Sequence, residues 1–148
     1  MTENLTRDEL GAYFALVAAG DLVERAVSAQ LAEHGLTPLQ FSILARLAEA
    51  PDGLRMSELA DQLVVSRSGL TYQITQLEKA GFVDRTTSAR DSRGVVAVLT
   101  EAGTARVQET FPGHVGLVRE NFLDLLDAAE VDAVRVTLEK VVAHLRSV

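Results

Sequence analysis

Two short helices in close succession, followed at once by a hairpin, constrain the fold of this chain most. Ser57 and Ser66 each precede an apolar stripe as typical helix N-caps, and Gly81 ends the second helix. Residues 82–85 and 95–99 are rich in strand-forming side chains and flank a polar loop. Two helices joined by a tight connection are typical of a helix-turn-helix, and the hairpin that follows predicts a wing beside it.

Longer helices are predicted before this unit. Apolar residues recur at helical spacing from about residue 6 to residue 34, and Gly35 supplies the stop. Thr37 and Gln40 then have the spacing of a capping box, so the next helix begins immediately afterwards.

The segment after the hairpin is also predicted to be helical. Thr100 begins an apolar stripe that Pro112 and Gly113 are expected to interrupt and bend. Asp127 caps a final helix, in which apolar residues of the segment 131–145 form a heptad seam. The end helices have more apolar surface than a small winged core can cover, so we expect a homodimer that buries it.

The predicted fold class is mainly α with a small β-wing. A length of 148 residues favours a single domain. We expect a winged helix-turn-helix in residues 37–103 and a helical dimerisation region formed by residues 1–36 and 104–148.

The composition excludes several kinds of chemistry. The chain has no cysteine, which excludes disulfides, thiolate metal sites and cysteine nucleophiles. Its three histidines are too scattered for a metal site, and the sequence has neither a glycine-rich phosphate loop nor a nucleophile elbow. We therefore expect no enzyme activity, no metal and no cofactor. No apolar run approaches the ~20 residues of a membrane helix, and residues 1–12 lack a signal-peptide core, so we expect a cytoplasmic protein without a membrane partner.

The charge distribution points to one segment. The net charge of −7 argues, taken globally, against a nucleic-acid partner. Residues 62–95, however, carry five lysines or arginines against three carboxylates. A mildly basic segment within an acidic frame makes double-stranded DNA a candidate partner for the second short helix and the hairpin.

The second short helix has the polar face that such a partner needs. Leu70, Ile74 and Leu77 cluster on one side, whereas the opposite side holds hydroxyls, an amide and one cation. These groups can bond to base edges and phosphates. An ordinary solvated face is the alternative, although that would more often mix lysine with glutamate. The candidate DNA-binding residues of this helix are Ser66, Arg67, Ser68, Thr71, Tyr72, Thr75, Gln76 and Lys79.

The hairpin loop supplies the remaining candidates. Arg90 and Arg93 are expected to contact DNA, because guanidinium groups suit the negative potential of a narrow minor groove. Asp91 would be repelled by phosphates, so we expect it to pair with a loop arginine and stabilise the wing. A charged surface hairpin without a partner is the alternative.

The ordered set of these segments resembles the multiple-antibiotic-resistance regulator (MarR) family. Residues 56–60 (MSELA) look like the start of its helix-turn-helix, and residues 77–85 (LEKAGFVDR) resemble the end of its recognition helix and its first wing strand. The segments DSRG at 91–94 and LTEAG at 99–103 resemble its wing tip and wing-to-helix junction. The resemblance implies a homodimeric regulator, usually a repressor, which a small phenolic or anionic molecule often releases from its operator.

Two departures limit what the resemblance implies. Tyr72 stands where relatives often have arginine, so a base preference is not carried over. The absence of cysteine and of tryptophan argues against the oxidation-sensing and urate-type branches of the family.

An effector pocket is predicted beside the expected bend at Pro112. Phe14, Phe41 and Phe111 are candidate apolar walls, and His114 is a candidate polar group. A solvated or core-bonded histidine is the alternative at that position.

Two other classes of function compete with operator binding. The first is a winged-helix protein-interaction module, and the second is a small-molecule-binding protein without a DNA partner. Arg93 and the carboxylate-free face of residues 66–79 favour DNA, because a pure scaffold needs neither.

Overall fold

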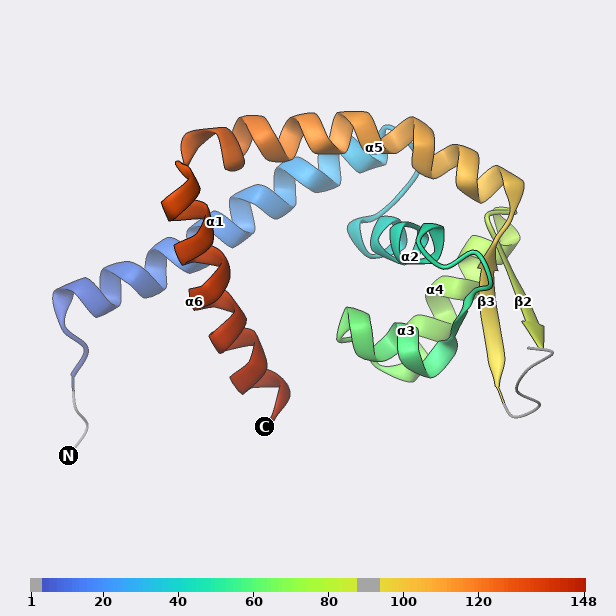
Figure 1. Cartoon of the computed structure of the whole chain (residues 1–148), viewed down its shortest axis with the longest axis horizontal. Helices are drawn as coiled ribbons and strands as arrows, with labels where there is room; N and C mark the ends of the chain where they lie inside the picture. The colour runs from blue at the N-terminus through green and yellow to red at the C-terminus, as the bar shows by residue number, and fades with distance from the viewer. Residues whose placement is uncertain (1–3, 88–93) are drawn as a thin grey trace.

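The computed structural model describes residues 4–87 and 94–148, which form a winged body at one end of an elongated helical region (Figure 1). The winged body comprises α2 (Pro38–Ala48), β1 (Leu54–Arg55), α3 (Met56–Leu63), α4 (Arg67–Lys79), β2 (Val83–Thr87) and β3 (Val95–Leu99). The helical region, which we call the arm, comprises α1 (Arg7–Ala32), α5 (Glu101–Asn121), the short 3₁₀ helix η1 (Leu123–Leu125) and α6 (Ala128–Arg146). The fold is therefore mainly helical with a small β-wing, as predicted.

Most helix starts lie where the sequence predicts them. Thr37 and Gln40 form the predicted capping box of α2, with backbone-to-side-chain distances of 3.1 and 3.2 Å. Asp127 caps α6, and Ser66 caps α4 by accepting a hydrogen bond from the Gly69 amide at 3.1 Å. The prediction that Ser57 is a cap is wrong: α3 begins at Met56, so Ser57 lies inside its first turn.

The reason for that early start is a strand of two residues. β1 pairs with β3, placing Arg55 opposite Val96, and the chain passes directly from this strand into α3. The described strands form an antiparallel sheet in the order β1-β3-β2. Gly53 precedes β1 with a φ of +86°, and a Cβ there would lie 2.4 Å from a methyl carbon of Val96. Only glycine fits this approach.

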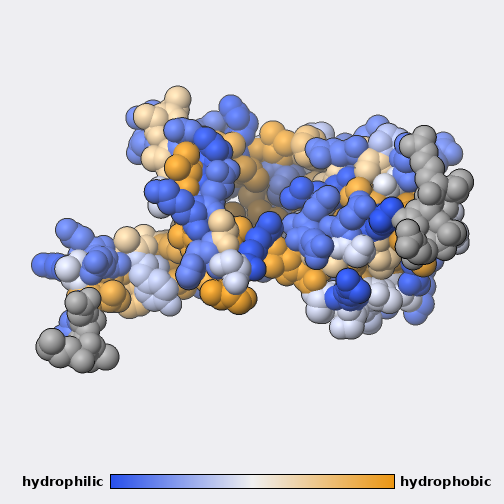
Figure 2. All heavy atoms as spheres, turned by 60° about the horizontal axis from the view of Figure 1, so that its bottom comes forward, coloured by the Kyte–Doolittle hydropathy of each residue, from blue (hydrophilic) through white to orange (hydrophobic). Residues whose placement is uncertain are grey.

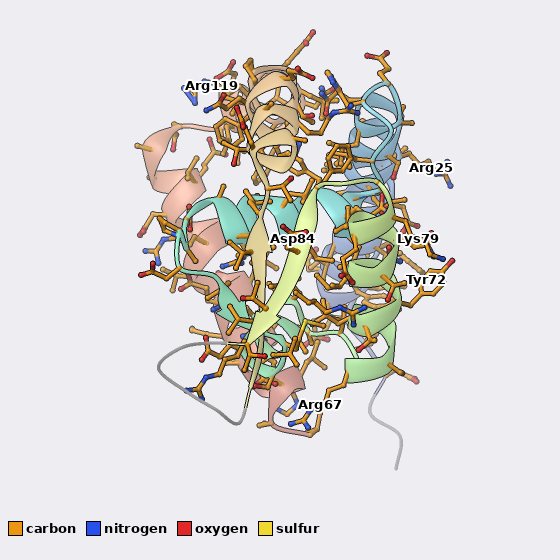
Figure 3. All side chains as sticks on the ribbon, turned by 90° about the vertical axis from the view of Figure 1, so that its right-hand side faces the viewer. Arg25, Arg67, Tyr72, Lys79, Asp84 and Arg119 are labelled. Carbon is orange, nitrogen blue, oxygen red and sulfur yellow. The ribbon has the colours of Figure 1, made fainter. Side chains whose placement is uncertain are left out.

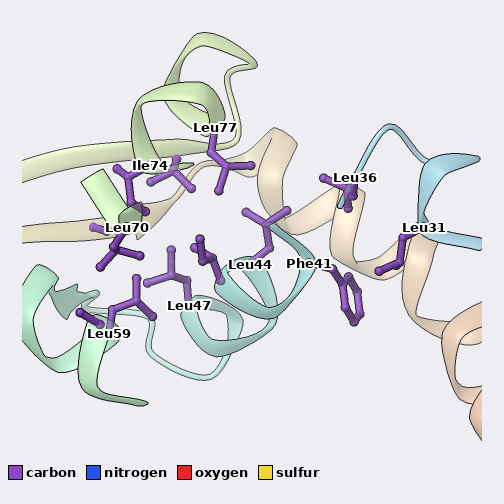
Figure 4. Packing of buried hydrophobic residues seen from close by; sticks show 13 residues of the cluster. Leu31, Leu36, Phe41, Leu44, Leu47, Leu59, Leu70, Ile74 and Leu77 are labelled. Atoms are coloured by element: carbon purple, nitrogen blue, oxygen red, sulfur yellow. The ribbon is translucent and has the colours of Figure 1, made fainter. Parts of the chain in front are cut away.

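The core joins α2 to the helix-turn-helix (Figure 4). Leu44 and Leu47 of α2 face Leu70, Ile74 and Leu77 of α4, and all five side chains are almost fully buried. The apolar stripe predicted for α4 therefore faces inward as expected. The opposite face of α4 is left toward solvent.

α5 is not interrupted at Pro112, although it is bent rather than straight, as Figure 1 shows. α5 continues through Pro112 and Gly113, and it ends only at Asn121, before Phe122 departs from helical geometry at φ −143° and ψ −68°. An internal proline removes one backbone hydrogen bond, and tertiary contacts hold the helix here. Gly113 lies close to the side chain of Gln30 in α1, and the ring of His114 lies 4.7 Å from that of Phe41 in α2.

Two hydrogen bonds fasten α5 to α1 and to the turn that follows it, near the winged body. The Arg106 guanidinium donates to the backbone carbonyl of His34 at 2.5 Å. The amide of Gln30 donates to the carbonyl of Thr110 at 3.4 Å. The long helix that follows the wing is thus anchored where α1 meets α2.

In the rest of the arm, few side chains are buried by other parts of the chain. Leu31 is the one buried residue of α1, and none of the 19 residues of α6 is buried, although the structure describes both helices along their whole length. Figure 2 shows apolar residues along the α1 arm and in the hollow beside it. α1, α5 and α6 enclose a groove of about 730 Å³, whose lining is almost entirely apolar and includes Leu117, Val118 and Leu138.

His114 gives the fold a predicted dependence on pH. Its Nδ1 is buried and has no hydrogen-bond partner among the described residues, and burial lowers the pKa of the imidazole below its usual 6.5. The unfolded chain therefore binds a proton at a higher pH than the folded one does. As pH falls through 6.5 toward the folded pKa, the stability of the folded state decreases.

We expect His114→Gln to lose this part of the pH dependence, because glutamine does not titrate in this range. Thermal unfolding followed by circular dichroism between pH 7.5 and pH 5 measures it. The melting temperature of the unmodified protein should fall more steeply than that of the variant. Parallel curves for the two proteins would contradict the assignment.

Candidate nucleic-acid interface

The exposed face of α4 is polar and projects from the winged body. Tyr72 is 61% exposed, and Figure 3 shows Tyr72 and Lys79 extending from the same side of the helix, away from the core. Arg67 lies at the other end of α4, near the end of β2. Leu70 and Ile74, buried against α2, fix the helix in this orientation.

The hydroxyl groups of this face differ in whether they can still donate a hydrogen bond. Thr71 donates to the carbonyl of Arg67 at 2.9 Å, and Thr75 donates to that of Thr71 at 2.8 Å. Each hydroxyl has a single proton, so in this geometry both threonines can only accept further hydrogen bonds. Phosphate oxygens are acceptors as well. Donation to a phosphate therefore falls to the other candidates, above all to the cations Arg67 and Lys79, which form no ion pair within the described chain.

The Ser66 hydroxyl is also committed, since it caps α4 and lies 3.4 Å from the Ser68 hydroxyl. Gln76 is partly exposed beside Tyr72 on the outward side of the helix. Tyr72 and Gln76 are thus the side chains of α4 best placed for contacts to base edges.

The one carboxylate of α4, that of Glu78, forms an ion pair. Glu78 lies 2.6 Å from the Arg85 guanidinium of β2, and that guanidinium also donates to the Thr75 hydroxyl at 3.2 Å. These contacts tie the first wing strand to α4. They also neutralise the one acidic side chain that would otherwise repel a polyanion near this face.

The loop candidates Arg90, Asp91 and Arg93 lie outside the described residues, so their predicted roles stay predictions. The description resumes at Gly94, where a Cβ would lie 3.7 Å from Cδ of Arg55.

A group of residues at the base of the wing is not among those predicted from the sequence. Arg55, Ser57 and Arg85 gather with Arg67 and Thr71 around an open depression of about 580 Å³. No local pattern singles out Arg55 or Ser57. Their position depends on the pairing of β1 with β3, which joins segments more than forty residues apart.

The four candidates for an effector site are not gathered around one cavity. Phe41 and His114 are in ring contact, whereas Phe14 is 58% and Phe111 50% exposed. None of the four lines the apolar groove between α1, α5 and α6. Across residues 4–87 and 94–148, no group of three or more histidine, aspartate or glutamate side chains has the arrangement of a metal site.

No helix in the described ranges combines the length and the hydropathy that crossing a bilayer requires.

Comparisons with known proteins agree with this geometry. A model of the MarR family matches residues 34–94. The crystal structure of AbsC, a MarR family transcriptional regulator from Streptomyces coelicolor, superposes with a TM-score of 0.95 at 35% identity, covering 99% of this chain and all of that one. Sco3205, a second MarR family regulator from Streptomyces coelicolor, was solved in complex with DNA; it superposes with a TM-score of 0.92 at 32% identity, covering 98% of this chain and 92% of its own.

A curated relative shows the same likeness. The transcriptional repressor YetL from Bacillus subtilis is 30% identical over 125 residues, which are 82% of this chain and 75% of YetL. The match extends beyond the winged body into the helices of the arm. The chain belongs to the MarR family of transcriptional regulators, and not to a family of enzymes.

Proposed function

We propose that the protein is a homodimeric repressor that binds a pseudo-palindromic DNA operator. The observation that supports this most is the outward face of α4, which presents Arg67, Tyr72 and Lys79 beside a wing strand. Its one carboxylate, Glu78, is already paired with Arg85. The DNA complex of Sco3205 and the repressor name of YetL support the same function. The loop residues Arg90 and Arg93 belong to the proposed DNA-binding set, and Asp91 to the residues that stabilise the loop.

The uncovered arm supports a homodimer. Most helical stability in proteins comes from packing of an apolar face, yet none of the 19 residues of α6 is buried in the single chain. Leu138, Val141 and Leu145 of its predicted seam are all exposed in the single chain. A second copy of the arm would cover them and fill the apolar groove with side chains of the same kind.

A two-fold axis through the arm would require a bound operator with matching two-fold symmetry. Two copies of α4 would enter successive major grooves, about 34–36 Å apart, and read matching half-sites. The operator is then a pseudo-palindrome whose spacing follows from the dimer.

We also propose that a small phenolic or anionic effector modulates DNA binding at the junction of α1, α2 and α5. Phe41 and His114 form the buried part of this site. The buried Nδ1 of His114 and Oε1 of Gln30, which lack partners among the described residues, are polar groups that a ligand could satisfy. The exposed Phe14 and Phe111 would contribute to it after being covered in the dimer. An effector of this kind acts only if it binds better to a dimer whose α4 helices have the wrong separation.

Tyr72 tests the DNA-reading role of α4. Selection of bound duplexes from a random-sequence pool gives the preferred operator of the unmodified protein. We expect Tyr72→Ala to relax the preference at one position of each half-site, at about 1–3 kcal/mol for the lost contact. Lys79→Gln is the matched control, because a lost phosphate contact weakens binding to all sequences alike.

Unchanged base preference in Tyr72→Ala would remove Tyr72 from the reading face. Absence of duplex binding by the unmodified protein, at low salt and micromolar concentration, would refute the proposed function itself.

Leu138 tests the homodimer. We expect Leu138→Glu to dissociate the protein, because it places a charge in the apolar groove that the partner would fill. Lys140→Glu introduces the same side chain two positions further along α6 and should leave the dimer intact. Sedimentation velocity at micromolar concentration distinguishes the two. An unmodified protein that sediments as a monomer would contradict the proposal.

A further inference from the structure

The depression at the base of the wing has the composition of an anion site. Three arginines from three different elements line it: Arg55 precedes α3, Arg67 begins α4 and Arg85 lies in β2. Ser57 and Gly94 complete the lining, together with Thr71, whose hydroxyl proton is already donated to the carbonyl of Arg67. The sequence separates these residues, and the pairing of β1 with β3 brings them together.

Among the described residues that line this depression, three are arginines and none is a carboxylate. Arg55 has a loose ion pair with Glu58, at 3.7 Å, and Arg85 has a close one with Glu78, at 2.6 Å. Neither glutamate lines the depression. Arg67 forms no ion pair within the described residues. Guanidinium groups present several donors in a fixed plane, which suits the oxygens of a phosphate.

We propose that this depression receives a phosphate of the DNA backbone, which Arg55, Ser57 and Arg67 hold from one side. The inference rests on the proposed function and assigns Arg55 and Ser57, which lie outside the recognition helix, to the DNA interface. Arg85 acts here as a positioning residue, because its guanidinium is already engaged by Glu78 and Thr75.

A duplex phosphate is favoured over a free anion by the location of the site. Arg67 belongs both to the depression and to the outward face of α4, so the two surfaces are continuous. The depression is also open, and a phosphate that remains part of a strand can reach it from outside. With α4 in the major groove, a strand that borders the groove would pass the base of the wing.

The test is the salt dependence of DNA binding by Arg55→Gln. Loss of one phosphate contact should reduce the slope of log K against log salt by about 0.9 per protomer, equally for the selected operator and for random duplex. Arg55→Lys, which keeps the charge, should retain a slope close to that of the unmodified protein.

Arg119→Gln is the matched control. Arg119 is an exposed arginine that forms an ion pair with Asp124 at 3.6 Å, and it lies far from Arg67, at the top of Figure 3 where Arg67 is at the bottom. Its slope should not change.

The possible results distinguish failure of the phosphate assignment from failure of the proposed operator binding. If the unmodified protein binds DNA and Arg55→Gln leaves the slope unchanged, the phosphate assignment is overturned while operator binding stands. If inorganic pyrophosphate binds to the unmodified protein but not to Arg55→Gln, and the DNA slope is still unchanged, the depression takes a free anion instead. If the unmodified protein binds no duplex at all, the proposed function fails first.

Discussion

The burial of one side of α4 against α2 determines what the rest of the winged body can do. Leu70, Ile74 and Leu77 are at most 2% exposed, and burial of each contributes about 1.5–3 kcal/mol. A rotation of the helix by one residue would expose part of this stripe and bury polar side chains in its place. The same packing that stabilises the body therefore directs Tyr72 and Lys79 outward.

The wing is held to that helix by polar contacts. Arg85 joins β2 to Glu78 and Thr75, and β1 brings Arg55 to the opposite edge of β3. The three arginines of the depression thus converge because the sheet and α4 are fixed relative to one another. The arm differs from the winged body, because α1 and α6 expose apolar side chains that the single chain cannot cover.

Features that depend on neighbouring residues could be predicted from the sequence. The capping boxes at Thr37 and Asp127, the cap at Ser66 and the buried stripe of α4 are all confirmed. Each follows from spacings of three or four residues, which a helix converts directly into contacts.

Features that depend on distant contacts could not be predicted in this way. Ser57 matches a cap by type, but the two-residue strand β1 moves the helix start ahead of it. Pro112 is a local signal for a break, yet the packing of α5 against α1 and α2 keeps the helix continuous. The arginine depression is invisible in the sequence for the same reason, because a strand pairing assembles it.

In the proposed complex two copies of α4 read one duplex together, and hydroxyl-radical footprinting of the selected operator measures this arrangement. We expect two protected tracts on one face of the duplex, with centres about one helical turn apart. Methylation of guanine N7 in the major groove within each tract should interfere with binding. A single protected tract, or binding that methylation of the major groove leaves unaffected, would rule out reading by two α4 helices.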